Sequence, residues 1–220
     1  MSEKAEQIMK KKGFIKAEMD KVFPKDQSDK LWNDATIKLS EILDKYKSLP
    51  EGVHNHTDSR IFPSSAIYLT IKPVLGADRA YKVIEDAAIV GCAGIQAKLA
   101  KLMRVPRMKG LFVKMWNPMT KKLFGSSCGF QNVFYPNKKG EYRMDITQCP
   151  YNRYFTELGC PEITKIFCGN DDRIYGNLPG LEFIRTGTLG RGADKCDFYL
   201  RLKKSGSFNM WHILQLSQKG

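Results

Sequence analysis

The sequence predicts an α+β fold, in which a helical N-terminal half packs on an antiparallel sheet from the C-terminal half. Three observations support this prediction: apolar residues recur at helical spacing up to residue 124, the period changes to two after residue 130, and turn-rich segments separate the later strands. Helices followed by antiparallel strands are typical of α+β proteins whose two layers share one core.

The N-terminal half contains four predicted helices, over residues 27–47, 63–74, 76–103 and 107–124. In the first, apolar residues recur every three or four positions, and Pro50 ends the run. The last is expected to be interrupted near Asn117 and Pro118. Residues 51–60, with the sequence EGVHNHTDSR, are expected to form a polar loop.

The C-terminal half contains the predicted strands, over residues 130–135, 141–148, 181–189 and 195–203. A turn-rich connection joins the first two strands as a hairpin. Pro150 suits the first position of a helix that follows Cys149, and a second short helix is expected over residues 161–167. In the last strand, alternate residues place one apolar set on one face: Cys196, Phe198, Leu200 and Leu202.

Composition limits the function classes. The chain carries 36 Lys and Arg against 23 Asp and Glu, a net charge of +13, but no arginine-rich run and no aromatic-basic signature of an RNA-binding sheet. A nucleic-acid partner is therefore not expected. No apolar secretory core begins the chain, and charges break its longest apolar stretch, so we expect a cytoplasmic protein without a membrane partner.

The predicted organisation has three parts: a basic helical extension over residues 1–25, a single α+β domain over residues 26–204 and a C-terminal tail over residues 205–220. The six cysteines are expected to be reduced in the cytoplasm, and therefore to serve as core residues, ligands or nucleophiles. The sequence is also compatible with a homo-oligomer.

The segment from Cys149 to Cys196 is the densest in chemically versatile side chains. Cys149 lies where the N-cap of a helix is expected, and unpaired N–H groups there favour a thiolate that can act as nucleophile or metal ligand. Asp171 and Asp172 follow a predicted helix end, and adjacent carboxylates in a loop can supply a general base. The alternatives are a buried cysteine and two solvated charges.

Two further patterns add to this segment. The glycine-rich stretch from Gly187 to Gly192 offers backbone N–H groups to an anion, with Arg185 or Arg191 as counter-charge. His54 and His56 form either a metal half-site, an acid/base pair or two loop residues without a role. No HExxH, paired CxxC, GxSxG or Walker A motif occurs.

The order of these residues resembles a known family. Cys149-Pro150-Tyr151, Cys168-Gly169-Asn170-Asp171-Asp172, Phe183–Leu189 and Gly192–Phe198 together resemble the L-2-amino-thiazoline-4-carboxylic acid hydrolase family, and the histidine segment followed by Phe62–Tyr68 fits its first half. The resemblance covers about residues 30–203. It implies hydrolysis of a carbon–nitrogen bond in a cyclic amidine, which opens a thiazoline ring to N-carbamoyl-cysteine, on a route of cysteine metabolism.

The resemblance also implies roles for the candidate residues. Cys149 would attack the amidine carbon, or Asp171 or Asp172 would activate water, while His54 or His56 protonates the departing ring nitrogen. Arg185 would clamp the substrate carboxylate, with Tyr151 and Arg191 also binding substrate. Alternatively, a divalent metal would be held by a histidine and three thiols, those of Cys149, Cys168 and Cys196. The rival function is a non-catalytic domain that binds a small ligand or metal in the same pocket.

Overall fold

The structure is a computed structural model that describes residues 2–136 and 138–203. Its N-terminal part contains the helices α1 (Glu3–Lys10), α2 (Gly13–Met19), α3 (Lys25–Lys45), α4 (Glu51–His56), α5 (Phe62–Leu75), α6 (Ala77–Leu102) and α7 (Met108–Leu123). Its C-terminal part contains β1 (Gln131–Phe134), β2 (Glu141–Gln148), α8 (Pro150–Glu157), α9 (Thr164–Tyr175), β3 (Leu181–Ile184) and β4 (Cys196–Leu202). Short turns of helix complete it: η1 (Thr57–Ile61), η2 (Ser126–Cys128), η3 (Pro161–Ile163) and η4 (Leu189–Arg191).

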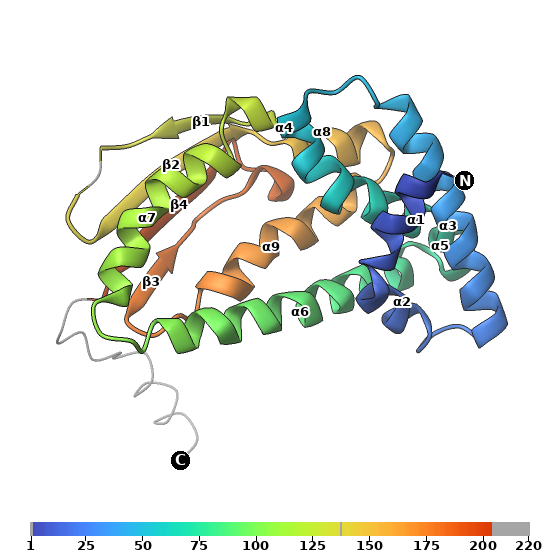
Figure 1. Cartoon of the computed structure of the whole chain (residues 1–220), viewed down its shortest axis with the longest axis horizontal. Coiled ribbons are helices and arrows are strands. Elements are labelled where there is room, and N and C mark those ends of the chain that lie inside the picture. The colour runs from blue at the N-terminus through green and yellow to red at the C-terminus, as the bar shows by residue number, and fades with distance from the viewer. Residues whose placement is uncertain (1, 137, 204–220) are drawn as a thin grey trace, which may run out of the picture.

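The predicted α+β class is confirmed, with helices first and a four-stranded antiparallel sheet after them. Figure 1 shows the sheet on the left, helices α1, α2, α3 and α5 on the right, and α6 running along the lower edge beneath both. The strand order is β1-β2-β4-β3, with antiparallel pairing throughout.

One face of the sheet is apolar and covered by helices. Met144 pairs with Phe198 and Ile146 with Cys196, so the buried apolar residues of β2 and β4 lie on the same face, as expected for the last strand. Helix α7 crosses this face in Figure 1, and its Trp116 ring lies 5.6 Å from the ring of Tyr142. An antiparallel sheet covered on one face leaves its other face to polar residues.

The helical part has its own centre. Helix α3 buries one stripe, which includes Leu31, Ala35 and Leu39, because these residues recur every four positions. This stripe packs on α5, whose first seven residues are all buried. A helix that is buried on every side lies in the middle of its layer, and α5 therefore anchors the helical part.

The buried residues form two clusters rather than the single shared core expected from the sequence. One lies among the helices on the right of Figure 1, and the other lies between α7 and the sheet. Tyr151, at the start of α8, packs against both clusters. Helix α6 also joins them, because Val83 and Ala87 belong to the first cluster while Leu99 packs on the second.

Three local predictions are wrong. Residues 51–60 are not a loop, because α4 continues into the π-helical turn η1. Strand β3 ends at Ile184, so residues 185–189 of the predicted strand lie outside it. Helix α7 is not interrupted at Pro118, which lies within the helix on its exposed side.

The basic segment predicted as an extension contributes to the helical core. Ala5, Met9, Ile15 and Met19 are all buried, and α2 packs on α6. The predicted tail over residues 205–220 lies outside the described residues. Within residues 2–136 and 138–203, none of the helices has the length and apolar content needed to cross a membrane.

We expect Met19→Ala to lower the free energy of unfolding by about 2–5 kcal/mol, because it leaves a cavity at a fully buried position. Val22→Ala, at a position that is 39% exposed in the same segment, is the matched control and should change it by only about 0.5 kcal/mol. Urea unfolding followed by circular dichroism measures both. Equal effects would show that the N-terminal helices do not pack as described.

Candidate functional site

A cavity of about 400 Å³ lies between the two buried clusters. Helices α6 and α9, the sheet residues Ile146 and Phe198, and Tyr151 form much of its wall. The lining is mostly apolar, with a few polar and charged groups, which is typical of sites for small molecules. These groups are Lys12, Arg60, Ser64, Cys92, Cys149, Cys168, Asn170, Asp171, Arg185 and Cys196.

The cavity brings together six of the residues singled out in the sequence: Cys149, Tyr151, Cys168, Asp171, Arg185 and Cys196. The other four, His54, His56, Asp172 and Arg191, are not in its lining. The expectation that a histidine faces the cysteine and aspartate groups directly is therefore not met by this cavity.

A buried guanidinium organises one wall. The Arg185 side chain is only 2% exposed, and it donates from Nη1 to Asp171 Oδ2 at 3.0 Å and from Nη2 to Asp172 Oδ2 at 2.5 Å. Nη2 also donates to the Cys168 carbonyl at 2.5 Å. Three acceptors on α9 thus hold Arg185, which directly follows β3.

The sequence predicts the acidic pair in a loop after a helix end, but Asp171 and Asp172 lie within α9. The helix continues through these residues because it packs along α6 and is bonded to Arg185. Successive residues on a helix point in different directions, so Asp171 lines the cavity while the Asp172 side chain remains 42% exposed. Burial raises the pKa of Asp171 to about 6, and the Arg185 charge opposes this rise. A carboxyl that titrates near neutrality can carry protons.

Cys168 is the best-activated thiol of the cavity. The hydrogen bond with the Cys196 thiol, the Gly190 backbone N–H and the charge of Arg185 hold the pKa of the Cys168 thiol well below its usual value, against the effect of burial. Gly190 matters because a methyl group there would lie only 2.8 Å from Cys168 Sγ. From the sequence, Cys168 is predicted only as a metal ligand.

Cys196 has the opposite character. Its hydrogen bond to Cys168 and its burial raise the pKa of its thiol, while the Leu189 N–H donates to its Sγ at 3.2 Å. Cys196 therefore acts as a neutral thiol that donates to its neighbour. The sulfur pair joins α9 to β4 at the cavity wall.

Cys149 occupies the predicted N-cap position of α8, but it lacks the predicted thiolate character. Burial raises the pKa of its thiol to about 12, and the N–H groups of Asn152 and Tyr151 only partly oppose this effect. Desolvation of the charged form thus outweighs the helix N-terminus. Cys149 is a neutral thiol in the cavity wall.

The predicted metal set is not formed. Across the part of the chain that the structure describes, no three side chains among His, Cys, Asp and Glu are grouped as metal ligands. Of the three thiols predicted as ligands, Cys168 and Cys196 form a hydrogen bond with each other.

The two histidines have separate partners. His54 Nδ1 lies 3.0 Å from Asp58 Oδ1, beside the Asp58–Lys4 ion pair. His56 is buried, and burial lowers its pKa, so it is neutral. Its Nε2–H donates to the Leu123 carbonyl at 2.7 Å, which leaves Nδ1 to accept from the Tyr151 hydroxyl at 3.1 Å. His56 thus orients a residue of the cavity without reaching it.

Several lining residues are not predicted from the sequence. Arg60 was part of the predicted loop, yet it lies in the π-helical turn η1, and such turns are frequent at functional sites. Lys12 was part of the presumed extension. Cys92 lies in a predicted helix and Tyr175 outside every predicted element, and only the packing of α6 against α9 places them at the cavity.

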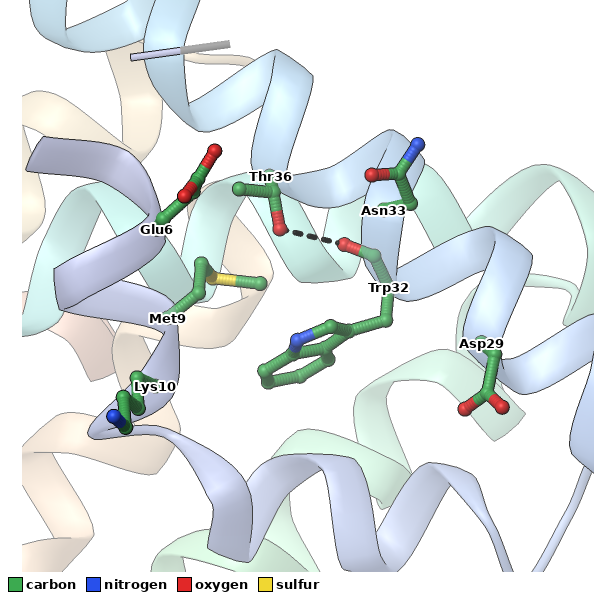
Figure 2. A pocket seen from close by; sticks show the side chains of 7 residues that line it. All are labelled: Glu6, Met9, Lys10, Asp29, Trp32, Asn33 and Thr36. Carbon is green, nitrogen blue, oxygen red and sulfur yellow. Dashed lines mark hydrogen bonds between the residues drawn. The ribbon is translucent and has the colours of Figure 1, made fainter. Parts of the chain in front are cut away.

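A second pocket, of about 320 Å³, lies on the outside of the helical part between α1 and α3. Figure 2 shows the Trp32 indole beside Met9 and Lys10, while Thr36 Oγ1 donates to the Trp32 carbonyl at 2.8 Å. Its lining contains neither a thiol nor an imidazole. The cavity between the two clusters is therefore the better candidate for a reaction.

Comparison with known protein families gives a match over most of the chain. The family model described as L-2-amino-thiazoline-4-carboxylic acid hydrolase matches residues 54–200. This range includes α9, β3, most of β4 and the turn that carries Arg60, but not Lys12. No curated protein and no solved structure matches the chain.

We expect iodoacetamide at pH 7 to modify Cys168 about tenfold faster than Cys149, because only Cys168 has a lowered pKa. Its rate should fall as the pH is lowered through that pKa, since the neutral thiol is unreactive. Cys196→Ala should slow the reaction by removing the thiol that donates to Cys168. Peptide mass spectrometry gives the site-specific rates, and equal rates at the two cysteines would contradict the assignment.

Proposed function

We propose that this chain, which belongs to the L-2-amino-thiazoline-4-carboxylic acid hydrolase family, hydrolyses a small cyclic amidine carboxylate. Cys168 is the proposed nucleophile. One observation carries the proposal: a thiol of lowered pKa and a carboxyl of pKa about 6 line the same cavity. An activated thiolate beside a proton carrier is what nucleophilic catalysis at an electron-poor carbon requires.

The first step forms a bond between Cys168 Sγ and the amidine carbon of the substrate. For an aminothiazoline ring, the ring carbon–sulfur bond then breaks, and its electron pair leaves on the ring sulfur. N-carbamoyl-cysteine keeps both nitrogens on the former amidine carbon. The departing atom is therefore sulfur, and not the ring nitrogen considered in the sequence analysis.

The second step releases the enzyme. Water attacks the same carbon, Asp171 accepts one of its protons, and Cys168 leaves as thiolate. The water oxygen becomes the carbonyl oxygen of the product, and the two water protons end on the ring nitrogen and the ring sulfur. Asp171 is suited to both directions of proton transfer, because a pKa of about 6 is close to the working pH.

Cys196 and Gly190 act on the thiolate when it attacks and when it leaves. Both donate to Cys168 Sγ, so they stabilise the negative charge on this sulfur. Arg185 adds a positive charge, and its bonds to Asp171 fix the carboxyl beside the thiol. The reaction requires reduced thiols, which is why we place the protein in the reducing cytoplasm.

We expect Cys168→Ala to abolish turnover of 2-amino-thiazoline-4-carboxylate, followed as thiol release, because the nucleophile is lost. Cys149→Ala is the matched control: it removes the neutral thiol of the same wall and should change kcat less than about tenfold. Intact-protein mass spectrometry of the wild type, quenched during turnover, should show an adduct on Cys168. Full activity of Cys168→Ala would exclude covalent catalysis by this residue.

We expect Asp171→Asn to lower kcat by about 100-fold or more, because the proton acceptor is lost. Asp172→Asn should have a much smaller effect, since this carboxylate binds Arg185 from outside the cavity lining. Steady-state kinetics of the two variants provides the comparison. A larger loss of kcat in Asp172→Asn than in Asp171→Asn would show that Asp171 is not the residue that transfers the proton.

A further inference from the structure

Two cations at the cavity have no acidic partner. Lys12 and Arg60 both line it, and across residues 2–136 and 138–203 neither takes part in an ion pair with a carboxylate. Lys12 Nζ instead donates to the Ser59 carbonyl at 2.5 Å. This contact holds the ammonium group next to the turn that carries Arg60.

The third cation of the cavity is already engaged. Arg185 is bonded to Asp171, to Asp172 and to the Cys168 carbonyl, and its side chain is 2% exposed. It cannot form a new bidentate pair with a substrate carboxylate without giving up bonds to its own carboxylates. A carboxylate that enters the cavity therefore needs another cationic partner.

Lys12 and Arg60 act on each other and on the cavity. Burial, followed by the charge of Arg60, lowers the pKa of Lys12, which shows that the two positive charges lie close together in a partly desolvated place. The Arg60 charge also acts on Tyr151 and Tyr175, two residues of the cavity wall. An anion between the two cations would relieve their repulsion.

The local structure holds Arg60 in place. It lies in η1, where the wider π-helical turn alters the direction of its side chain relative to an α-helix. Its guanidinium is a hydrogen-bond partner of the Tyr151 hydroxyl, which in turn donates to His56 Nδ1. This chain of contacts keeps Arg60 directed at the cavity.

We infer that Arg60 and Lys12 form the subsite that binds the substrate carboxylate, while Cys168 and Asp171 receive the amidine. This inference rests on the proposed function for the identity of the substrate. Tyr151, a hydrogen-bond partner of Arg60, lines the same cavity as Asp171. Selection for a carboxylate then depends on Lys12, a residue outside the family-matched range.

The test measures binding to the full chain carrying Cys168→Ala, so that no ligand is consumed. Isothermal titration calorimetry compares 2-amino-thiazoline-4-carboxylate with 2-aminothiazoline, which lacks the carboxylate. Adding Arg60→Gln or Lys12→Gln should raise the Kd of 2-amino-thiazoline-4-carboxylate about 10- to 100-fold, because a charge-assisted hydrogen bond is lost. The Kd of 2-aminothiazoline should stay unchanged. Arg79→Gln and Lys11→Gln remove exposed charges outside the cavity lining and should change neither Kd.

A second probe separates this inference from the proposed reaction. Cyclopentanecarboxylate has a five-membered ring and a carboxylate but no amidine, and cyclopentanecarboxamide is its neutral control. If the carboxylate binds and Arg60→Gln removes this binding, the subsite stands even where no thiazoline is turned over. If Arg60→Gln binds every carboxylate as well as its parent does, or weakens charged and neutral ligands alike, the subsite is refuted, whatever the enzyme hydrolyses.

Discussion

Arg185 connects the end of β3 to α9 through Asp171, Asp172 and the Cys168 carbonyl. A buried guanidinium is costly unless acceptors surround it, and here two carboxylates and a carbonyl accept hydrogen bonds from it. The same contacts fix the carboxyl that titrates near pH 6 and place positive charge beside the Cys168 thiol. The stability of this wall and the reactivity of its sulfur therefore have one electrostatic origin.

The position of the cavity follows from the way the chain divides its apolar residues. The helices and the sheet each bury their own cluster, and the cavity lies where the two meet. Tyr151 packs against both clusters, while neutral His56 accepts a hydrogen bond from its hydroxyl. A side chain fixed at both ends in this manner gives the cavity a rigid element, although His56 itself takes no part in the lining.

The fold class and half of the site were predictable because they depend on local pattern. The alternation along β4 correctly placed Cys196 on the covered face, and the Cys149-Pro150 pair correctly marked the start of α8. What failed depends on distant contacts. Neither the burial that keeps Cys149 neutral nor the thiol that activates Cys168 is encoded in neighbouring residues. A π-helical turn likewise has no simple sequence signal, so Arg60 was placed in a loop.

The N-terminal helices have a practical consequence for work on relatives of this protein. The matched region begins at residue 54, whereas Lys12, Phe14 and Ile15 complete the cavity from before it. A version trimmed to the matched region would open the cavity to bulk water and expose the side of α6 on which α2 packs. Screens that use such trimmed proteins would therefore test a widened binding site and could miss the natural substrate. Exchange of the first two helices between relatives offers a route to altered ligand preference that leaves Cys168 and Asp171 unchanged.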